Sequence, residues 1–166
     1  MKALNSFAVL ALLAAPLAPA VAATSNVEVS YVNPQKFQDA GIHGTRGTKD
    51  VGRTLDALTK HFEKQGDRYL KPGQSLKIEV LDVDLAGRVE WWRTQFYDAR
   101  ILRTIDSPAI KLRYTLNENG QTLRSGEEWV RDLDYLWGIN PRFHRYDELR
   151  YEKVMLDDWM KKRFAG

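Results

Sequence analysis

Two carboxylates stand two residues apart at the end of an apolar run, in the segment VLDVDLAGR (80–88). Asp82 and Asp84 are followed by Gly87 and Arg88. Paired carboxylates can hold a divalent cation or carry out acid–base chemistry. They can also mark the point where a strand leaves the core, so their meaning depends on which way they face.

The phase of the strand decides between these two interpretations. Alternate apolar residues from Leu76 to Val80 share one face. Unbroken alternation would turn Asp82 and Asp84 toward the core, where only a cation or arginine partners would make them tolerable. A β-bulge between Val80 and Leu81 would reverse every later side chain and turn the aspartates outward. Because bulges are common and buried charge pairs are costly, we favour the bulge.

A second acidic segment, DLDYLWG (132–138), resembles DVDLAG and suggests a shared four-carboxylate site for calcium or magnesium. The expected topology argues against it. In a four-strand meander the first and fourth strands run in opposite directions, so their carboxyl ends lie at opposite edges. We therefore predict no metal site.

Glu152 is the third carboxylate of interest. The apolar face of the last predicted helix includes Leu149, Leu156, Trp159 and Met160, and Glu152 falls within it on a helical wheel. A carboxylate in that position needs a partner. We expect an arginine from the sheet, with Arg88, Arg103 and Arg113 as the candidates, and favour a structural ion pair over a catalytic acid.

The segment WWRTQFY (91–97) places four aromatic residues in a long connection. If exposed, Trp91 and Trp92 could stack on sugars, lipid headgroups or a protein partner. If folded back, they would cover the sheet or pack on the last helix. Packing is the commoner fate of tryptophan, and we favour it.

The remaining polar motifs are less specific. The loop GIHGTRGTK (41–49) could present an anion site at a helix N-terminus, but it lacks phosphate-loop spacing, and we expect a mobile loop. The histidines His43, His61 and His144 lack zinc-ligand spacing. We expect His61 to be packed beside the first helix.

The pattern of elements predicts an α+β fold. Strands are expected at 27–32, 75–87, 99–105, 109–116 and 121–133, with helices from Asp50 and over 147–163. The order β-α-β-β-β-β-α favours a mostly antiparallel sheet of about five strands with two helices on one face. The first strand would join as a parallel or edge strand through a right-handed crossover.

The N-terminus predicts export. Lys2 precedes a short apolar run broken by Pro16 and Pro19, and the run ends in small residues suited to cleavage near Ala22 or Ala23. This gives a signal peptide over 1–23 and one globular domain over 24–166. No later segment reaches the roughly 18 to 20 apolar residues of a membrane span.

Composition narrows the chemistry further. The chain has no cysteine, which excludes disulfides, thiolate metal sites and the lipid anchor of bacterial lipoproteins. The 25 Lys and Arg residues nearly balance the 22 Asp and Glu residues, so we expect no nucleic-acid partner. No motif indicates a cofactor.

Three segments resemble a known family: GQSLKIEVLDVDLAGR, IKLRYTL after Pro108, and YDELRYEKVMLDDW (146–159). They are similar to the exported bacterial family called domain of unknown function 3016. The resemblance extends from Val27 to about Phe164. It implies a small signal-bearing protein, periplasmic in a Gram-negative cell, with no assigned activity, so it brings no catalytic residues to carry over.

Two functional hypotheses follow. The leading one is a non-enzymatic accessory or binding protein of the cell envelope. It would contact a protein or a small envelope ligand through Asp82, Asp84, Arg88, Trp91, Trp92 and Glu152. The alternative is a divalent-cation-dependent envelope hydrolase that uses Asp82, Asp84 and Glu152.

Overall fold

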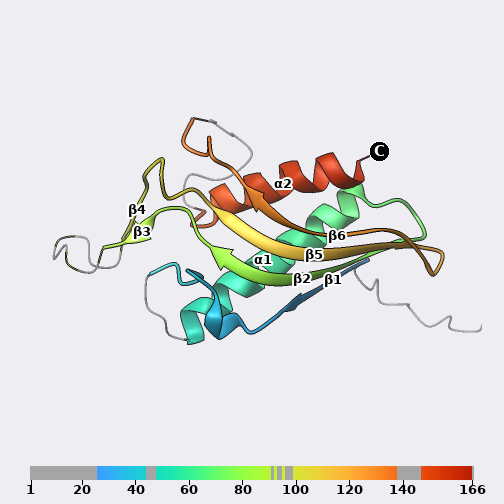
Figure 1. The fold of residues 1–166 in the computed structure, drawn as a ribbon, viewed down its shortest axis with the longest axis horizontal. Coiled ribbons are helices and arrows are strands. Elements are labelled where there is room, and N and C mark those ends of the chain that lie inside the picture. The colour runs from blue at the N-terminus through green and yellow to red at the C-terminus, as the bar shows by residue number, and fades with distance from the viewer. Residues whose placement is uncertain are drawn as a thin grey trace, which may run out of the picture.

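The computed structural model describes residues 26–43, 48–90, 92, 95, 99–137 and 147–165. The predicted signal peptide lies outside these residues. Figure 1 shows a curved sheet crossed by two helices. The elements in chain order are β1 (Val27–Tyr31), the 3-10 turn η1 (Pro34–Lys36), α1 (Thr48–Tyr69), β2 (Gln74–Asp84), β3 (Arg88–Val89), β4 (Arg100–Ile101), β5 (Ala109–Glu118), β6 (Gln121–Arg131) and α2 (Arg150–Phe164).

The main sheet has four strands in the order β1-β2-β5-β6. β1 runs parallel to β2, while β2, β5 and β6 pair antiparallel. The α+β class and the parallel first strand are therefore confirmed. The helix α1 forms the connection between β1 and β2 that a parallel pair requires.

The predicted strand over 99–105 is wrong. Only Arg100 and Ile101 are extended, and they pair with β3 in a separate two-stranded sheet. β2 hydrogen-bonds directly to β5, so no position remains between them for another strand. As a result β2 and β6 run in the same direction, and both end where β5 begins. We call this edge, marked by Asp84, Ala109 and Arg131, the sheet end.

Both helices cover one face of the main sheet, as predicted. The Tyr31 hydroxyl donates to the Leu55 carbonyl of α1 at 2.8 Å, and the Tyr114 ring meets Trp159 of α2 edge-on at 5.7 Å. Tyr31 pairs with Val80 of β2, and Tyr114 pairs with Ile78 of the same strand. Because Ile78 and Val80 are two residues apart on one strand, Tyr31 and Tyr114 point to the same side of the sheet. Leu58 and Phe62 of α1 are fully buried in this core.

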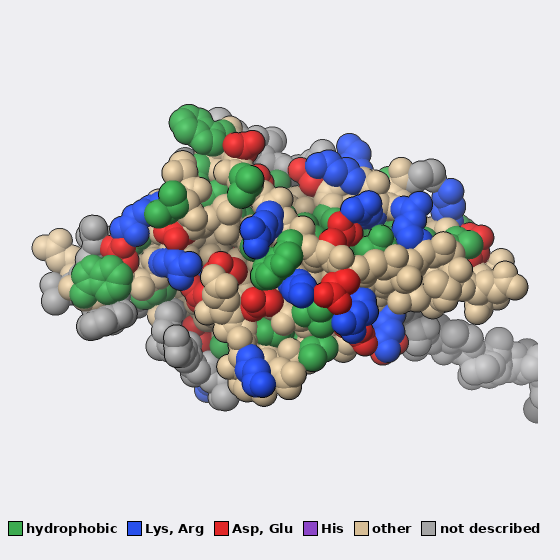
Figure 2. All heavy atoms as spheres, in the orientation of Figure 1, with side chains coloured by type: hydrophobic (Ala, Val, Ile, Leu, Met, Phe, Trp, Pro, Cys, Tyr) green, Lys and Arg blue, Asp and Glu red, His purple; other side chains and the backbone are tan. Residues whose placement is uncertain are grey.

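The opposite face is open and polar. Four side chains form a chain of ion pairs across β2, β5 and β6: Glu79 contacts Arg113, Arg113 contacts Glu127, and Glu127 contacts Lys111. Figure 2 shows acidic and basic side chains interspersed on the surface. Such a face is stable in water without a covering layer.

His61 is packed, as expected. It is buried on α1, and its Nε2 lies 3.0 Å from the Lys153 carbonyl oxygen of α2. Burial lowers the pKa of His61 to about 4. The neutral ring therefore joins the two helices.

The predicted bulge is present. The β2–β5 register shifts between Val80 and Asp82. After the shift, Val83 and Leu85 enter the core, with 0% and 2% of their surface exposed. Because the side chains after the bulge change to the other side of the sheet, the apolar ones enter the core and the two aspartates point away from it.

Gly87 allows the chain to turn beyond β2. Its φ is +71°, and an added Cβ would lie 2.6 Å from the Ile101 carbonyl oxygen. We expect Gly87→Ala to lower the free energy of unfolding by about 3 kcal/mol, from the left-handed backbone together with the steric clash. Urea denaturation measures this change.

Gly120 provides the matched control. It also has a positive φ, +82°, but open space surrounds its Cβ position. Gly120→Ala should cost only about 1 kcal/mol, because it carries backbone strain alone. Equal losses in the two variants would contradict the role of close packing at Gly87.

Candidate functional site

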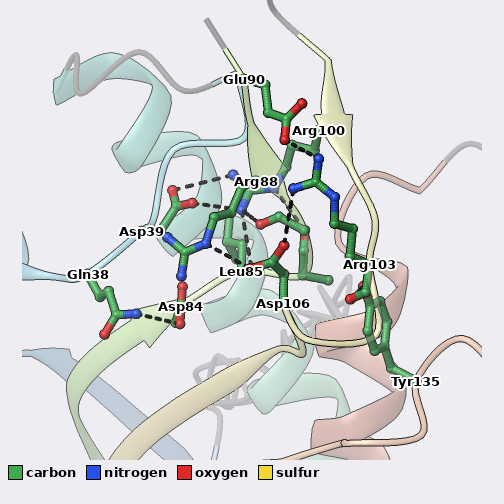
Figure 3. A network of polar contacts seen from close by, with 12 residues as sticks. Gln38, Asp39, Asp84, Leu85, Arg88, Glu90, Arg100, Arg103, Asp106 and Tyr135 are labelled. Atoms are coloured by element: carbon green, nitrogen blue, oxygen red, sulfur yellow. Dashed lines mark hydrogen bonds and ion pairs between the residues drawn. The ribbon is translucent and has the colours of Figure 1, made fainter.

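Asp82 and Asp84 bind Gln38 in the loop after β1 (Figure 3 shows the Asp84 contact). The Asp82 Oδ1 accepts from the backbone N–H groups of Gln38 at 2.8 Å and Val83 at 2.9 Å. The Asp84 Oδ2 accepts from the Gln38 side-chain amide at 2.7 Å. Partial burial raises the pKa of Asp84, and the neighbouring Arg88 opposes this. The pair therefore attaches the β1 loop to the end of β2.

Arg100 is the centre of the polar network at the sheet end, and sequence reasoning missed it. Its Nη2 donates to the Asp39 Oδ2 at 2.8 Å, and its Nη1 donates to the Asp39 Oδ1 at 3.3 Å. The guanidinium also donates to a set of backbone carbonyls, those of Gly41, Leu85, Ala86 and Gly87. These bonds join the loop after β1, the loop after β2 and β4.

Only a weak signal in the sequence pointed to this arrangement. Asp39-Ala40-Gly41 and Leu85-Ala86-Gly87 are similar small-residue turns, which let backbone carbonyls approach a guanidinium closely. Nothing distinguishes Arg100 from the other arginines in the chain. Its partners become visible only once the two turns are brought together.

A second layer of ion pairs extends the network. Arg88 donates to the Asp106 carboxylate at 2.8 Å, and Arg103 pairs with the buried Glu90. The Tyr135 hydroxyl donates to the Arg103 carbonyl at 2.7 Å (Figure 3). The segment after β6 is thus tied to the segment before β5.

Glu152 is 1% exposed at the start of α2, in the core as predicted. The predicted arginine partner is wrong, because Oε1 instead accepts from the backbone N–H of Ala86 at 2.6 Å. Among the described residues Oε2 has no hydrogen-bond partner. Burial raises the pKa of Glu152, while the Ala86 N–H and the more distant charge of Arg100 act in the opposite direction. A protonated carboxyl fits this position.

The peptide of Ala86 therefore connects two charged side chains. Its N–H donates to Glu152, and its carbonyl accepts from Arg100 at 2.9 Å. Two of the segments that carry the family resemblance, VDLAGR and YEKVMLDDW, meet at this contact.

The topological argument against a shared acidic site is wrong. Since β2 and β6 end at the same edge, Asp132 and Asp134 follow β6 at the sheet end, as Asp82 and Asp84 lie at the end of β2. Even so, the part of the chain that the structure describes contains no group of three or more acidic or histidine side chains placed to hold a metal ion. Asp82 and Asp84 both bind Gln38, whereas Glu152 binds the backbone of Ala86.

The aromatic connection is only partly described. Trp92 is 61% exposed, so the predicted packing is wrong for this residue. Trp91 and most of the segment lie outside the described residues, as do residues 44–47 of the glycine loop and His144. Of the described helices, none has the length and apolar character needed to cross a membrane.

Arg100→Met should strongly destabilise the fold. The side chain is 10% exposed, and its loss would leave the Asp39 carboxylate and several carbonyls without a donor. We expect the free energy of unfolding to fall by about 3–5 kcal/mol in urea denaturation. Arg113→Met, on the open face, should leave the midpoint near the wild-type value. A mild effect at Arg100 would contradict its central role.

Glu152→Gln should change how stability depends on pH. Because the folded-state pKa lies above the ordinary 4.5, the folded protein keeps a proton that the unfolded chain loses. The stability contributed by Glu152 is full below pH 4.5 and declines as the pH rises toward the folded-state pKa. The variant should therefore gain stability relative to wild type with rising pH, measured by urea denaturation at several pH values.

Glu127→Gln is the control of opposite sign. Lys111 and Arg113 lower the pKa of Glu127, so its ionised form stabilises the fold above its ordinary pKa of 4.5. This variant should lose stability relative to wild type as the pH rises. Parallel pH profiles for the two variants would refute the assignment.

Comparison with known proteins identifies the family alone. Residues 25–162 match the family described as "Protein of unknown function (DUF3016)", which confirms the resemblance found in the sequence. No curated protein and no solved structure matches the chain. The matched range includes the whole sheet, the Arg100 network and nearly all of α2. The chain belongs to the DUF3016 family.

Proposed function

We propose that this protein is exported to the cell envelope and works there as a non-catalytic binding protein, with the sheet end as its contact surface for a protein partner. Export is supported by the charged, apolar and small-residue order of residues 1–23. The contact surface is supported by the distribution of exposed apolar side chains, and this observation carries the proposal.

Exposed apolar residues gather at one end of the molecule. Of the eight large hydrophobic side chains exposed among the described residues, all but Leu123 lie at or near the sheet end. The most distal of them, which we call the sheet-end surface, are Trp92, Ile105, Leu133, Leu136 and Trp137. In Figure 2, apolar side chains protrude at the left of the view, where β3 and β4 lie.

Hydrogen bonds fix the backbone that carries the sheet-end surface. Tyr135 sits between Leu133 and Trp137 in sequence and is 3% exposed, with its hydroxyl bound to the Arg103 carbonyl. Ile105, 83% exposed, lies next to Asp106, whose carbonyl accepts from the Gly87 N–H at 2.8 Å. A preorganised apolar surface loses little conformational entropy on binding.

The charges around this surface favour a protein over a membrane. Acidic and basic groups alternate there, as in the pairs Arg88–Asp106 and Arg103–Glu90, and Asp132 and Asp134 flank Leu133. Anionic membranes select clusters of Lys and Arg. Aromatic side chains within a rim of both charges are typical of protein interfaces.

Site-specific photo-crosslinking in cells tests this proposal. A photoreactive residue at position 133 or 137 should give a discrete crosslinked protein in the periplasmic fraction, because both side chains project from the proposed interface. Leu133→Ser should abolish the crosslink formed from position 137.

Leu123 is the matched control. It is 53% exposed, of the same type as Leu133, and lies at the opposite end of β6. The same photoreactive residue at position 123 should give no discrete product. Retention of the protein in the cytoplasm, or equal crosslinking from positions 123 and 133, would reject the proposal.

A further inference from the structure

Exposed basic side chains gather at the end of the molecule opposite the sheet end. Figure 1 shows that α1 and α2 both end here, next to the turn between β5 and β6. The Tyr69 hydroxyl donates to Asp157 at 2.9 Å, and Arg124 donates to the Arg163 carbonyl at 2.8 Å, so the two helix ends and the start of β6 lie together. We call this region the basic end, and its exposed basic residues are Arg68, Lys71, Arg124, Lys161, Lys162 and Arg163.

Most carboxylates near the basic end are turned inward. Three of them accept hydrogen bonds from neighbouring side chains, in the pairs Asp157–Tyr69, Glu128–Trp159 and Glu118–Gln74. The exposed carboxylates closest to the basic end in sequence are Asp67 and Asp158. The outer surface around the two helix ends therefore has an excess of basic groups.

Most of these basic groups keep their charge available. Among the described residues, the ion pairs of the basic end are those of Arg68 with Asp157, at 3.7 Å, and of Arg163 with Glu128. Basic groups in the last turn of a helix also stabilise its dipole, but Lys71 and Arg124 lie outside the helices. Figure 2 shows the basic side chains at the right of the view, near the end of α2 and the start of β6. The charge is thus more than helix capping requires.

The N-terminal segment joins the body at the same end. Val27 pairs with Leu76, near the start of β2, so β1 begins at the basic end. If residues 1–23 direct export, as proposed above, the basic end is tied to the membrane until that segment is cleaved. An exported protein meets phospholipid rather than nucleic acid at this stage.

Leu123 adds an apolar side chain to the basic end. It is 53% exposed and precedes Arg124 near the start of β6. Anionic phospholipids attract clusters of Lys and Arg, and an apolar side chain among them can enter the headgroup layer. This combination is absent from the sheet-end surface, where Asp132 and Asp134 flank Leu133.

We propose that the basic end binds reversibly to the anionic phospholipid surface of a membrane, with Leu123 at the headgroup layer. The 11 residues of β2 place the sheet-end surface about 35 Å away, so that surface faces a protein partner rather than the bilayer. The two surfaces share no residue. A failure of either proposal therefore leaves the other in place.

Vesicle sedimentation with the full chain tests the binding. The protein should bind vesicles made of equal parts of phosphatidylglycerol and phosphatidylcholine, and added salt should weaken this binding. Lys161→Gln combined with Lys162→Gln should weaken it about thirtyfold, because each basic group near an anionic surface contributes to the attraction. The same pair should leave binding to phosphatidylcholine alone unchanged. All variants share residues 1–23, so any contribution of that segment cancels.

Lys36→Gln combined with Lys49→Gln is the matched control. It removes the same charge from exposed positions near the sheet end, so binding to the anionic vesicles should stay near the wild-type value. Equal losses from the two pairs would overturn the proposal. Equal affinity for double-stranded DNA at the same ionic strength would also overturn it, because the basic end would then be a general polyanion site.

A fluorescent label reports which end approaches the bilayer. The chain has no cysteine, so Leu123→Cys and Leu133→Cys each provide a single attachment point. A polarity-sensitive dye at position 123 should shift to shorter wavelength when anionic vesicles are added, whereas the dye at position 133 should stay in water. Equal shifts at the two positions, or a shift at position 133 alone, would reject the proposed orientation.

Discussion

The architecture of the sheet end depends on one guanidinium. Arg100 gathers a carboxylate and four backbone carbonyls from two turns that are distant in sequence. Those carbonyls lie in loops and have no strand partner to satisfy them. A buried loop is tolerable only when such groups are paired, and a planar group with five donors can pair several of them at once.

The need to pair these carbonyls explains how the Ala86 peptide is shared between Arg100 and Glu152. With Arg100 attached to the carbonyl side of Ala86, the N–H side is left for Glu152 of α2. The turn after β2 is therefore held by the sheet side and by the helix side together. The N–H of Gly87 in this turn also donates to the carbonyl of Asp106, which lies next to Ile105 of the sheet-end surface.

Sequence reasoning succeeded where a local rule governed the structure. The alternation from Leu76 to Leu85 could be reconciled with an apolar core only by a slip, and the bulge after Val80 provides it. Prediction from the sequence failed where the structure depends on contacts between residues that are distant in the chain. Residues 99–105 resemble a strand in composition, but the direct pairing of β2 with β5 leaves no place for one. Glu152 needed a partner, as expected, yet a backbone N–H meets that need, and backbone donors carry no sequence signal.

The position of α2 has a consequence for the order of folding. The ring of Trp159, which meets Phe62 and Tyr114, and the side chain of Met160 come from this last helix. Until residues 150–164 leave the ribosome, the apolar side chains that this helix covers stay exposed, so we expect a stable tertiary structure to form only late in synthesis.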